Sequence, residues 1–316
     1  MTGYQIICQC NPKPSDIPNF CQPGFFFNET EHLQQQSTQP FYLLTAVNQR
    51  SQQAEARCAF FLDNNVAVSP KAAPFGSIEF AENLPESVLD TFLQTIIEAA
   101  QSVFATTLRV VNYPYCYAPQ QMKQLLAKLS TLGFQVVETN QTFYLPVTTE
   151  IFTDNLIPAE RRRLRKCAEA GLNFQYWSSP NVANIVNFLQ ETRQQQGYEL
   201  TICPDKLANL LQTFPNQFLV FMVNDGPRLA ALSVAVRVRE DILYSFLPAS
   251  HSNYRTFSPM VMLTYGLYTY CQQQGIRLLD LGTSLDENNQ PKHSLMRFKR
   301  NLGAQESPKF VFEKHF

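Results

Sequence analysis

Residues Asn253–Asp280 read NYRTFSPMVMLTYGLYTYCQQQGIRLLD, and this stretch decides how the second half of the chain can fold. A polar loop leads into Ser258-Pro259, a long apolar run and then Gly275. Serine can accept a hydrogen bond from a free N–H group at a helix start, and proline fits the first helical position. The pattern predicts a helix from Ser258 to about Gln274 and then a strand over Arg277–Leu281. The polar residues before this helix are either an ordinary cap or an anion site.

Three apolar runs precede this stretch and predict an antiparallel meander: Phe218–Val223, Leu229–Val238 and Ile242–Leu247. The predicted helix must return the chain to the same sheet. Its flanking strands, Ile242–Leu247 and Arg277–Leu281, should therefore be parallel. Elsewhere in this half, helices are predicted over 158–170, 180–197, from 204 and over 291–302, and strands over 172–177 and 309–313.

The first half of the chain repeats this order. Strands are predicted over 42–47, 57–62, 66–69, 107–111 and 134–137, and helices from 85 and over 119–132. We therefore expect two mixed α/β units, mainly antiparallel with a parallel strand pair at the cleft. The expected domains are 1–150 and 151–316, with the boundary near Pro146–Asn155.

The composition narrows the class of protein. The chain has 316 residues, is 45% hydrophobic and carries a formal net charge of −1, which favours a sizeable core and argues against a dedicated duplex-binding protein. The longest uncharged stretch, Thr256–Ile276, contains tyrosines and glutamines, so we read it as a buried helix rather than a membrane span. No secretory leader is recognisable, which favours a cytoplasmic protein with its eight cysteines as free thiols and no metal site.

Five short segments carry a resemblance to a known superfamily. They are RRRLRKCAEAGLNF (Arg161–Phe174), TFSP (Thr256–Pro259), LLDLGTS (Leu278–Ser284), LMRFKRNLGA (Leu295–Ala304) and SPKAAPFGSI (Ser69–Ile78). Their order resembles the GNAT superfamily of acyl-CoA N-acyltransferases, in the tandem, double-GNAT arrangement of the Fem-type and acetyltransferase-like group. The resemblance implies transfer of an acyl group from acyl-CoA to a small-molecule or peptide amine, with the donor bound in the second domain. An aminoacyl-tRNA donor is the alternative, and a non-catalytic binding protein on the same fold is another.

The loop before the central helix departs from the family pattern. GNAT enzymes hold the coenzyme A pyrophosphate on an Arg/Gln-x-x-Gly-x-Gly/Ala loop, where glycine lets backbone N–H groups reach the anion. The corresponding loop here, Pro248–Phe257, contains no glycine. An anion would therefore need side chains from this region as well as the helix start; the candidates are Ser252, Asn253, Tyr254, Arg255 and Ser258.

Most of the remaining site candidates lie in or near the two strands that should flank the cleft, Ile242–Leu247 and Arg277–Leu281. Asp280 lies in an apolar strand, where burial would raise its pKa and suit it to act as a base, and His251 is a second acid–base candidate. The backbone at Phe246 and Leu247 would polarise the thioester carbonyl. Lys299 is either a phosphate contact or an ordinary surface charge. The basic run 161–166 is either a solvated helix face or a rim for phosphates or RNA.

Overall fold

The computed structural model describes residues 3–197, 199–286 and 288–316. Its contacts divide the chain into unit 1, Met1–Gln141 with Ser307–Phe316, and unit 2, Thr142–Glu306. We expected a single domain boundary near residue 150. The contacts place the boundary between Gln141 and Thr142 and group the C-terminal residues, Ser307–Phe316, with the first unit.

Unit 2 is a mixed sheet in which one pair of neighbouring strands is parallel. The order is β7-β12-β11-β10-β9-β8. Only β11 and β12 run parallel, whereas the other neighbours are antiparallel. This confirms the predicted meander and the predicted parallel return. The strand bounds are β7 Gln135–Pro146, β8 Asn173–Tyr176, β9 Phe218–Asp225, β10 Arg228–Arg239, β11 Ile242–Ser250 and β12 Leu278–Thr283.

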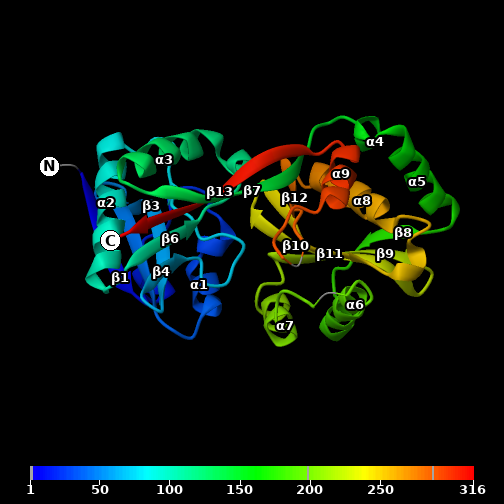
Figure 1. Ribbon diagram of the computed structural model, residues 1–316, viewed down its shortest axis with the longest axis horizontal. Coiled ribbons are helices and arrows are strands. Elements are labelled where there is room, and N and C mark those ends of the chain that lie inside the picture. The colour runs from blue at the N-terminus through cyan, green and yellow to red at the C-terminus, as the bar shows by residue number, and fades with distance from the viewer. Residues whose placement is uncertain (1–2, 198, 287) are drawn as a thin grey trace. The chain divides into compact units, whose positions relative to one another are not determined.

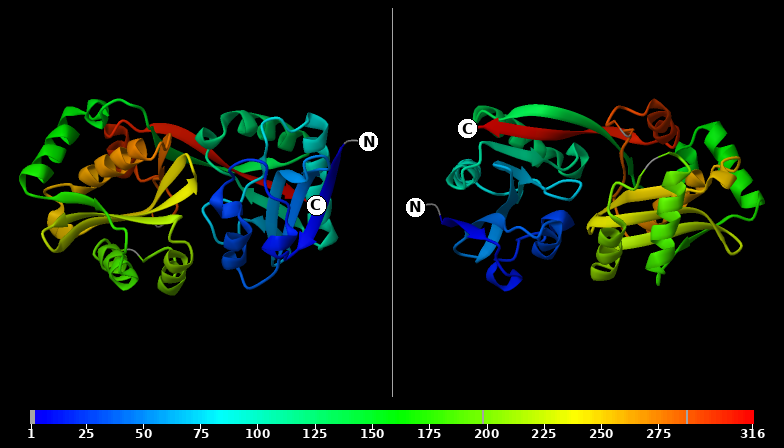
Figure 2. Two further views of the ribbon diagram at one scale, coloured as in Figure 1. Left: turned by 180° about the vertical axis from the view of Figure 1, so that it is seen from behind. Right: turned by 60° about the horizontal axis from the view of Figure 1, so that its bottom comes forward.

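Helices cover both faces of this sheet (Figures 1 and 2). The central helix α8, Pro259–Gln273, connects β11 to β12 and packs across one face, against alternate residues of β9: Leu219, Phe221 and Val223. This alternation follows from the two-residue period of a strand. Helices α6, Val182–Gln194, and α7, Pro204–Thr213, lie on the other face. The remaining helices of unit 2 are α4 Phe152–Asn155, α5 Pro158–Glu169 and α9 His293–Asn301.

Unit 1 has the same plan. Its strand order is β1-β2-β3-β4-β6-β13, and β4 and β6 form its parallel pair across helix α2. The strands are β1 Tyr4–Cys10, β2 Phe41–Asn48, β3 Gln53–Asp63, β4 Val66–Ser69, β6 Thr107–Val111 and β13 Gln305–His315, with a short β5, Glu79–Phe80, on β3. The helices are α1 Thr30–Gln36, α2 Glu86–Ser102 and α3 Pro119–Thr131.

The two faces of the unit 1 sheet have separate cores, which again reflects strand alternation. On β2, Leu44 and Ala46 belong to the core that contains the α2 side chains. Phe41 and Leu43, one residue out of phase, pack with Leu33 of α1. Helix α1 and strand β1 escaped the sequence prediction because both are short and neither contains a long apolar run.

The predicted start of α6 at Ser179-Pro180 is wrong: the helix begins at Val182, and the side chain of Asn181 accepts the capping hydrogen bond from Asn184 N–H at 3.1 Å. All eight cysteines are free, as predicted. Among the residues that the structure describes, no helix is long and apolar enough to cross a membrane.

Gly266 in the middle of α8 lets the helix lie directly against the ring of Phe174 on β8. A Cβ atom added there would lie 2.2 Å from the ring of Phe174, which is stacked on Phe221. Glycine normally weakens a helix interior by about 1 kcal/mol relative to alanine. Here the missing side chain makes room for an aromatic ring.

We therefore predict that Gly266→Ala destabilises the protein by about 1–3 kcal/mol, because the ring must move or the helix must shift. Denaturant unfolding would measure the change. In a Phe174→Ala background the same substitution should be neutral or stabilising, because only helix propensity remains. Equal effects in both backgrounds would contradict the packing explanation.

Candidate functional site

The parallel strands of unit 2 are paired over only three residues. The register runs Ile242↔Leu278, Leu243↔Leu279 and Tyr244↔Asp280, and it ends there. Beyond this point β11 continues along β10 to Ser250, whereas β12 continues along β7 to Thr283. Within the described residues, the backbone groups of β11 that point away from β10 therefore have no partner strand after Tyr244. The sheet opens at this position.

A β-bulge lies on each strand where the two part. On β11, Leu247 opposes Val234 and Ser245 opposes Ala235, so Phe246 is the extra residue. On β12, a register shift falls between Asp280 and Gly282. Bulges of this kind bend a strand and are common beside active sites. Phe246 is half-buried, with its ring centroid 5.7 Å from that of Tyr244, whereas Leu247 is buried.

Asp280 lies at the last paired position of β12, and its side chain is buried. Its Oδ1 accepts a hydrogen bond from Gly282 N–H at 2.6 Å. Gly282 has φ +70°, and a Cβ atom there would lie 3.0 Å from the Tyr244 ring, so glycine suits both the backbone and the space. Burial raises the pKa of Tyr244, and the charge of Asp280 adds to this effect.

Lys299 of α9 contacts the last two residues of β12. Its Nζ donates to the carbonyls of Gly282 at 3.0 Å and Thr283 at 2.7 Å, and lies 5.4 Å from the Phe143 ring centre. The residue is only 6% exposed, so it is not an ordinary surface charge. Burial lowers the pKa of Lys299 to about 8, although the negative charge of Asp280 acts in the opposite direction.

The chain enters α8 through a backbone conformation that normally favours glycine. Ser258, the residue before the helix, has φ 57° and ψ 57°, which is the left-handed conformation. Its side chain makes no capping hydrogen bond, so the cap that we predicted from Ser258-Pro259 is absent. The residue directly before α8 is therefore left-handed, and its hydroxyl makes no hydrogen bond to the N–H groups at the start of the helix.

One side of the loop contacts α6. His251 Nδ1 accepts a hydrogen bond from Asn253 N–H at 3.2 Å, while its Nε2 lies 3.3 Å from Glu191 Oε1. Ser252 N–H donates to Gln195 Oε1 at 3.2 Å. His251 is seven positions beyond Tyr244, which corresponds to about 20 Å of extended chain, so the structure does not bring it to Asp280.

The other side of the loop contacts α5. Lys166 Nζ donates to the carbonyl of Thr256 at 2.8 Å and lies 5.1 Å from the Phe257 ring centre. Cys167 Sγ donates to the Phe257 carbonyl at 2.9 Å. Within the loop itself Asn253 and Arg255 are exposed, whereas Tyr254 donates its hydroxyl to Asp225 at 2.9 Å. Of the candidate anion contacts, Asn253 and Arg255 are thus exposed beside Lys166 of a neighbouring helix, whereas Ser252 and Ser258 are half-buried.

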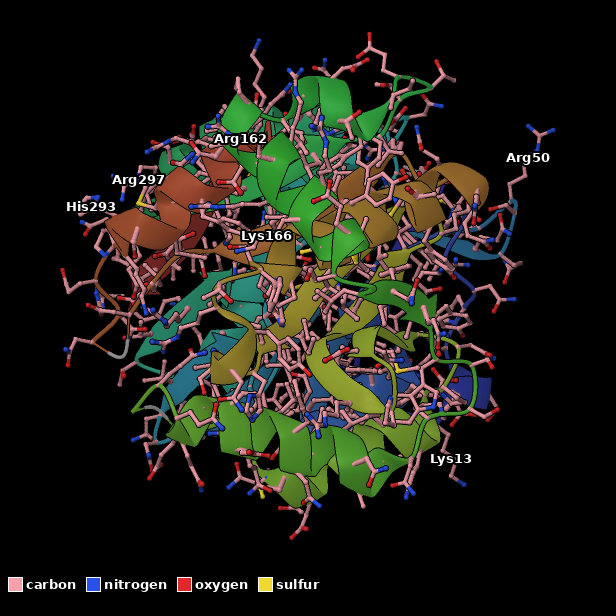
Figure 3. All side chains as sticks on the ribbon, turned by 90° about the vertical axis from the view of Figure 1, so that its right-hand side faces the viewer. Lys13, Arg50, Arg162, Lys166, His293 and Arg297 are labelled. Carbon is pink, nitrogen blue, oxygen red and sulfur yellow. The ribbon has the colours of Figure 1, made fainter. Side chains whose placement is uncertain are left out.

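The basic run on α5 divides into bonded and unbonded members. Arg161 donates to the Leu156 carbonyl, and Arg163 pairs with the buried Glu160. Arg162 and Arg165 are exposed and form no ion pair within the described residues. The start of α5 is joined to the end of α9 by Ile157 N–H and the Asn301 carbonyl, 3.2 Å apart. Figure 3 shows basic side chains on both helices: Arg162 and Lys166 on α5, and His293 and Arg297 on α9.

Sequence reasoning missed two members of the group around Asp280. Tyr244 joins it only through the register of β11 on β12, which no local pattern specifies. Thr283 contributes a carbonyl that accepts a hydrogen bond from Lys299. Gly282 could have been found, because an Asp-x-Gly sequence at the end of a strand is typical of a turn in which the carboxylate bonds the backbone.

The sheet of unit 2 thus opens beside the helix that links its two parallel strands, as expected for the GNAT-like fold to which the sequence pointed. Residues 159–300 match the family model of the acetyltransferase (GNAT) domain. Unit 2 therefore contains a GNAT domain. In the described part of the chain, no cluster of three or more histidine, cysteine, aspartate or glutamate side chains could hold a metal ion.

Solved structures extend the match to the whole chain. A structure of FemX is similar with a TM-score of 0.72 and 13% identity, covering 93% of each chain. A tandem GNAT protein from the clavulanic acid biosynthesis pathway has a TM-score of 0.56 and 10% identity, covering 99% of this chain and 98% of that one. The C-terminal domain of a putative lysylphosphatidylglycerol synthetase from Agrobacterium fabrum has a TM-score of 0.56 and 13% identity, covering 83% and 82%. No curated protein sequence matches significantly. The chain thus has a double-GNAT fold, similar to that of FemX.

The conformation of Ser258 leads to a stability prediction. A residue other than glycine in the left-handed conformation destabilises the folded protein by about 1–2 kcal/mol. Glycine removes this strain, but it also makes the unfolded chain more flexible, which cancels part of the gain in stability. Ser258→Gly should therefore leave stability unchanged or raise it by up to about 1 kcal/mol. Ser258→Ala should change it by less than about 0.5 kcal/mol, because no cap is lost. A loss of about 1 kcal/mol or more in Ser258→Ala, measured by denaturant unfolding, would restore the cap interpretation.

The buried amine of Lys299 leads to a prediction about pH. Its pKa of about 8 lies below the value of 10.5 for a free lysine, so the unfolded chain holds this proton more tightly than the folded chain. Stability should rise as the pH increases from about 8 to 10.5 and be lost again as the pH falls through 8, by about 3 kcal/mol in total.

The measurement is the difference in unfolding free energy between the unaltered protein and Lys299→Met at several pH values. Taking the difference cancels the other groups that titrate in this range. The exposed Lys123→Met serves as the control and should show no such pH dependence. A difference for Lys299→Met that stays constant from pH 7 to pH 10 would contradict the assigned burial effect.

Proposed function

We propose that the protein is an N-acyltransferase that moves an acyl group from an acyl-CoA thioester to an amine, with the donor bound in unit 2. The observation that carries this proposal is the end of the β11–β12 register at Tyr244 and Asp280, in the two strands that α8 connects. Ligands of open α/β sheets bind at the carboxyl ends of strands that part from each other. The GNAT family match of residues 159–300 supports the same assignment.

The open edge of β11 suits the extended part of an acyl-CoA. After Tyr244 this edge has no partner strand among the described residues, although the Pro248 carbonyl accepts a hydrogen bond from Arg193 at 3.3 Å. The remaining backbone groups would bond the amides of the donor as a further strand would. The phosphates would then lie near the helix start, where the field of α8 favours an anion. Side-chain contacts there would come from Ser252, Asn253, Arg255 and Ser258, with Lys166 beside them. The Tyr254 hydroxyl is already bonded to Asp225, so its ring is the part available to the donor.

The chemistry that we propose needs little covalent participation by the protein. The acceptor nitrogen attacks the thioester carbonyl, and backbone N–H groups at the Phe246 bulge and Leu247 stabilise the oxyanion that forms. The carbon–sulfur bond then breaks, and coenzyme A leaves as the thiolate. We place Asp280 as the acceptor of the proton that the amine loses, because it lies at the point where the strands part. His251 lies at the other end of β11 against Glu191, so we do not assign it this step.

Titration of the whole protein with acetyl-CoA and longer acyl-CoAs by calorimetry tests the proposal. We expect binding, and we expect Arg255→Ala to weaken it by at least about tenfold because it removes a charge-assisted phosphate contact. The exposed Arg50→Ala in unit 1 is the matched control and should leave affinity unchanged. If no acyl-CoA binds, or if both variants lose the same affinity, the donor site is misassigned.

An aminoacyl-tRNA donor is the second candidate, and the observation that favours it is the pair of unbonded arginines on α5, Arg162 and Arg165. The fold similarity to FemX makes this comparison worth a direct test. Binding of tRNA should then weaken steeply as the salt concentration rises. The double variant Arg162→Ala/Arg165→Ala should reduce the slope of log affinity against log salt concentration by about two. Failure to bind either donor would leave a non-catalytic binding protein on the same fold.

A further inference from the structure

Lys299 is a buried primary amine whose hydrogen-bond partners are both uncharged. Its side chain is 6% exposed, and Nζ donates only to the carbonyls of Gly282 and Thr283 among the residues that the structure describes. Buried lysines are normally paired with a carboxylate. No salt bridge in the described chain involves Lys299, and Asp280 influences it only through its nearby charge. This arrangement is unusual enough to require an explanation.

The neutral amine can keep both hydrogen bonds, although the Phe143 ring and the charge of Asp280 favour the protonated form. A protonated amine has three N–H groups, and two of them are used by the two carbonyls, at 3.0 and 2.7 Å. Removal of the third proton therefore breaks no hydrogen bond between described residues. The vacated tetrahedral position then carries the lone pair. An amine held in this way is a nucleophile, because only the unprotonated form can attack a carbonyl carbon.

The position of this amine coincides with that of the chemistry we assigned to unit 2. Gly282 and Thr283 are the last residues of β12, and they lie beyond Asp280, where pairing with β11 has already ended. The opposite side of this opening is the bulge at Phe246, where we place the thioester carbonyl. The nucleophile and the electrophile of an acyl transfer would therefore occupy the same opening.

We propose that Lys299 is a self-acylation site, at which the bound acyl donor modifies the protein itself when no acceptor amine is present. Nζ attacks the thioester carbonyl, a carbon–nitrogen bond forms and the carbon–sulfur bond breaks. The thiol leaves as free coenzyme A and takes up the proton that Nζ loses. The product is a stable amide that cannot be protonated and that fills part of the opening, so it blocks further donor binding. This inference rests on the acyl-CoA site proposed above.

The pKa of about 8 supports a large preference for this lysine over exposed ones. At about pH 7.5, roughly a quarter of such an amine is neutral, compared with about a thousandth of an ordinary lysine. The expected preference from this effect alone is therefore about 200-fold, before any gain from positioning beside the donor.

The test uses the unaltered full chain, incubated with acetyl-CoA without an acceptor amine at about pH 7.5. Peptide mapping by mass spectrometry follows the acetylated fraction at Lys299 and at the exposed Lys13 and Lys123. We expect Lys299 to be acetylated at least about tenfold faster than either exposed lysine, with a rate that saturates as donor increases and that free coenzyme A suppresses. Acetylation of the exposed lysines should be linear in donor and unaffected by coenzyme A.

Two measurements keep failure of this inference separate from failure of the donor site. Calorimetry in parallel reports whether acetyl-CoA binds. If it binds while Lys299 is modified no faster than Lys123, self-acylation is wrong and the donor site stands. If it does not bind and Lys299 remains unmodified, both are wrong. Lys299→Arg, which keeps the positive charge, should bind acetyl-CoA but give no modification at this position, and it should retain donor affinity after the long incubation that blocks the unaltered protein.

Discussion

The arrangement of unit 2 depends on where one set of backbone hydrogen bonds stops. Three residue pairs join β11 to β12, and after Tyr244 and Asp280 each strand follows a different neighbour. Helix α8 lies between these strands in the chain and begins just past the opening. The loop, the bulge at Phe246 and the buried Asp280–Lys299 group are all placed by this divergence. If the strands stayed paired to their ends, none of these groups would share a site.

Unit 1 shows what the same order of elements gives without an opening. The segment that follows β4 bonds the end of β6, with Gly76 N–H donating to the Val111 carbonyl at 3.0 Å. Aromatic rings fill the surrounding space: Phe25 lies 5.6, 4.8 and 5.7 Å from Phe75, Tyr113 and Tyr117, measured between ring centres. All four side chains are buried. This packing gives the first unit a filled interior at the corresponding position, which is why our proposals concern unit 2.

Much of the fold could be predicted from the sequence because its signals are local. The apolar helix after Ser258 and the meander before it required only periodicity and turn residues, and the parallel pairing followed from the need to return to the sheet. The site was less predictable because its contacts join distant residues. Ser258-Pro259 resembles a cap in sequence, yet the serine adopts a left-handed conformation and bonds no helix N–H. Lys299 resembles a surface charge on a basic helix, and only tertiary packing shows that it is buried.

Hydrogen exchange of the β11 amides, with and without acetyl-CoA, tests the central claim most directly. In the free protein, amides after Tyr244 that face away from β10 should exchange faster than those of Ile242–Tyr244, because they have no partner strand. Saturating acetyl-CoA should slow exchange at Phe246–Ser250 and leave β4 and β6 of unit 1 unchanged. Exchange in β11 that is uniformly slow in the free protein, or that saturating donor does not alter, would contradict an open donor edge.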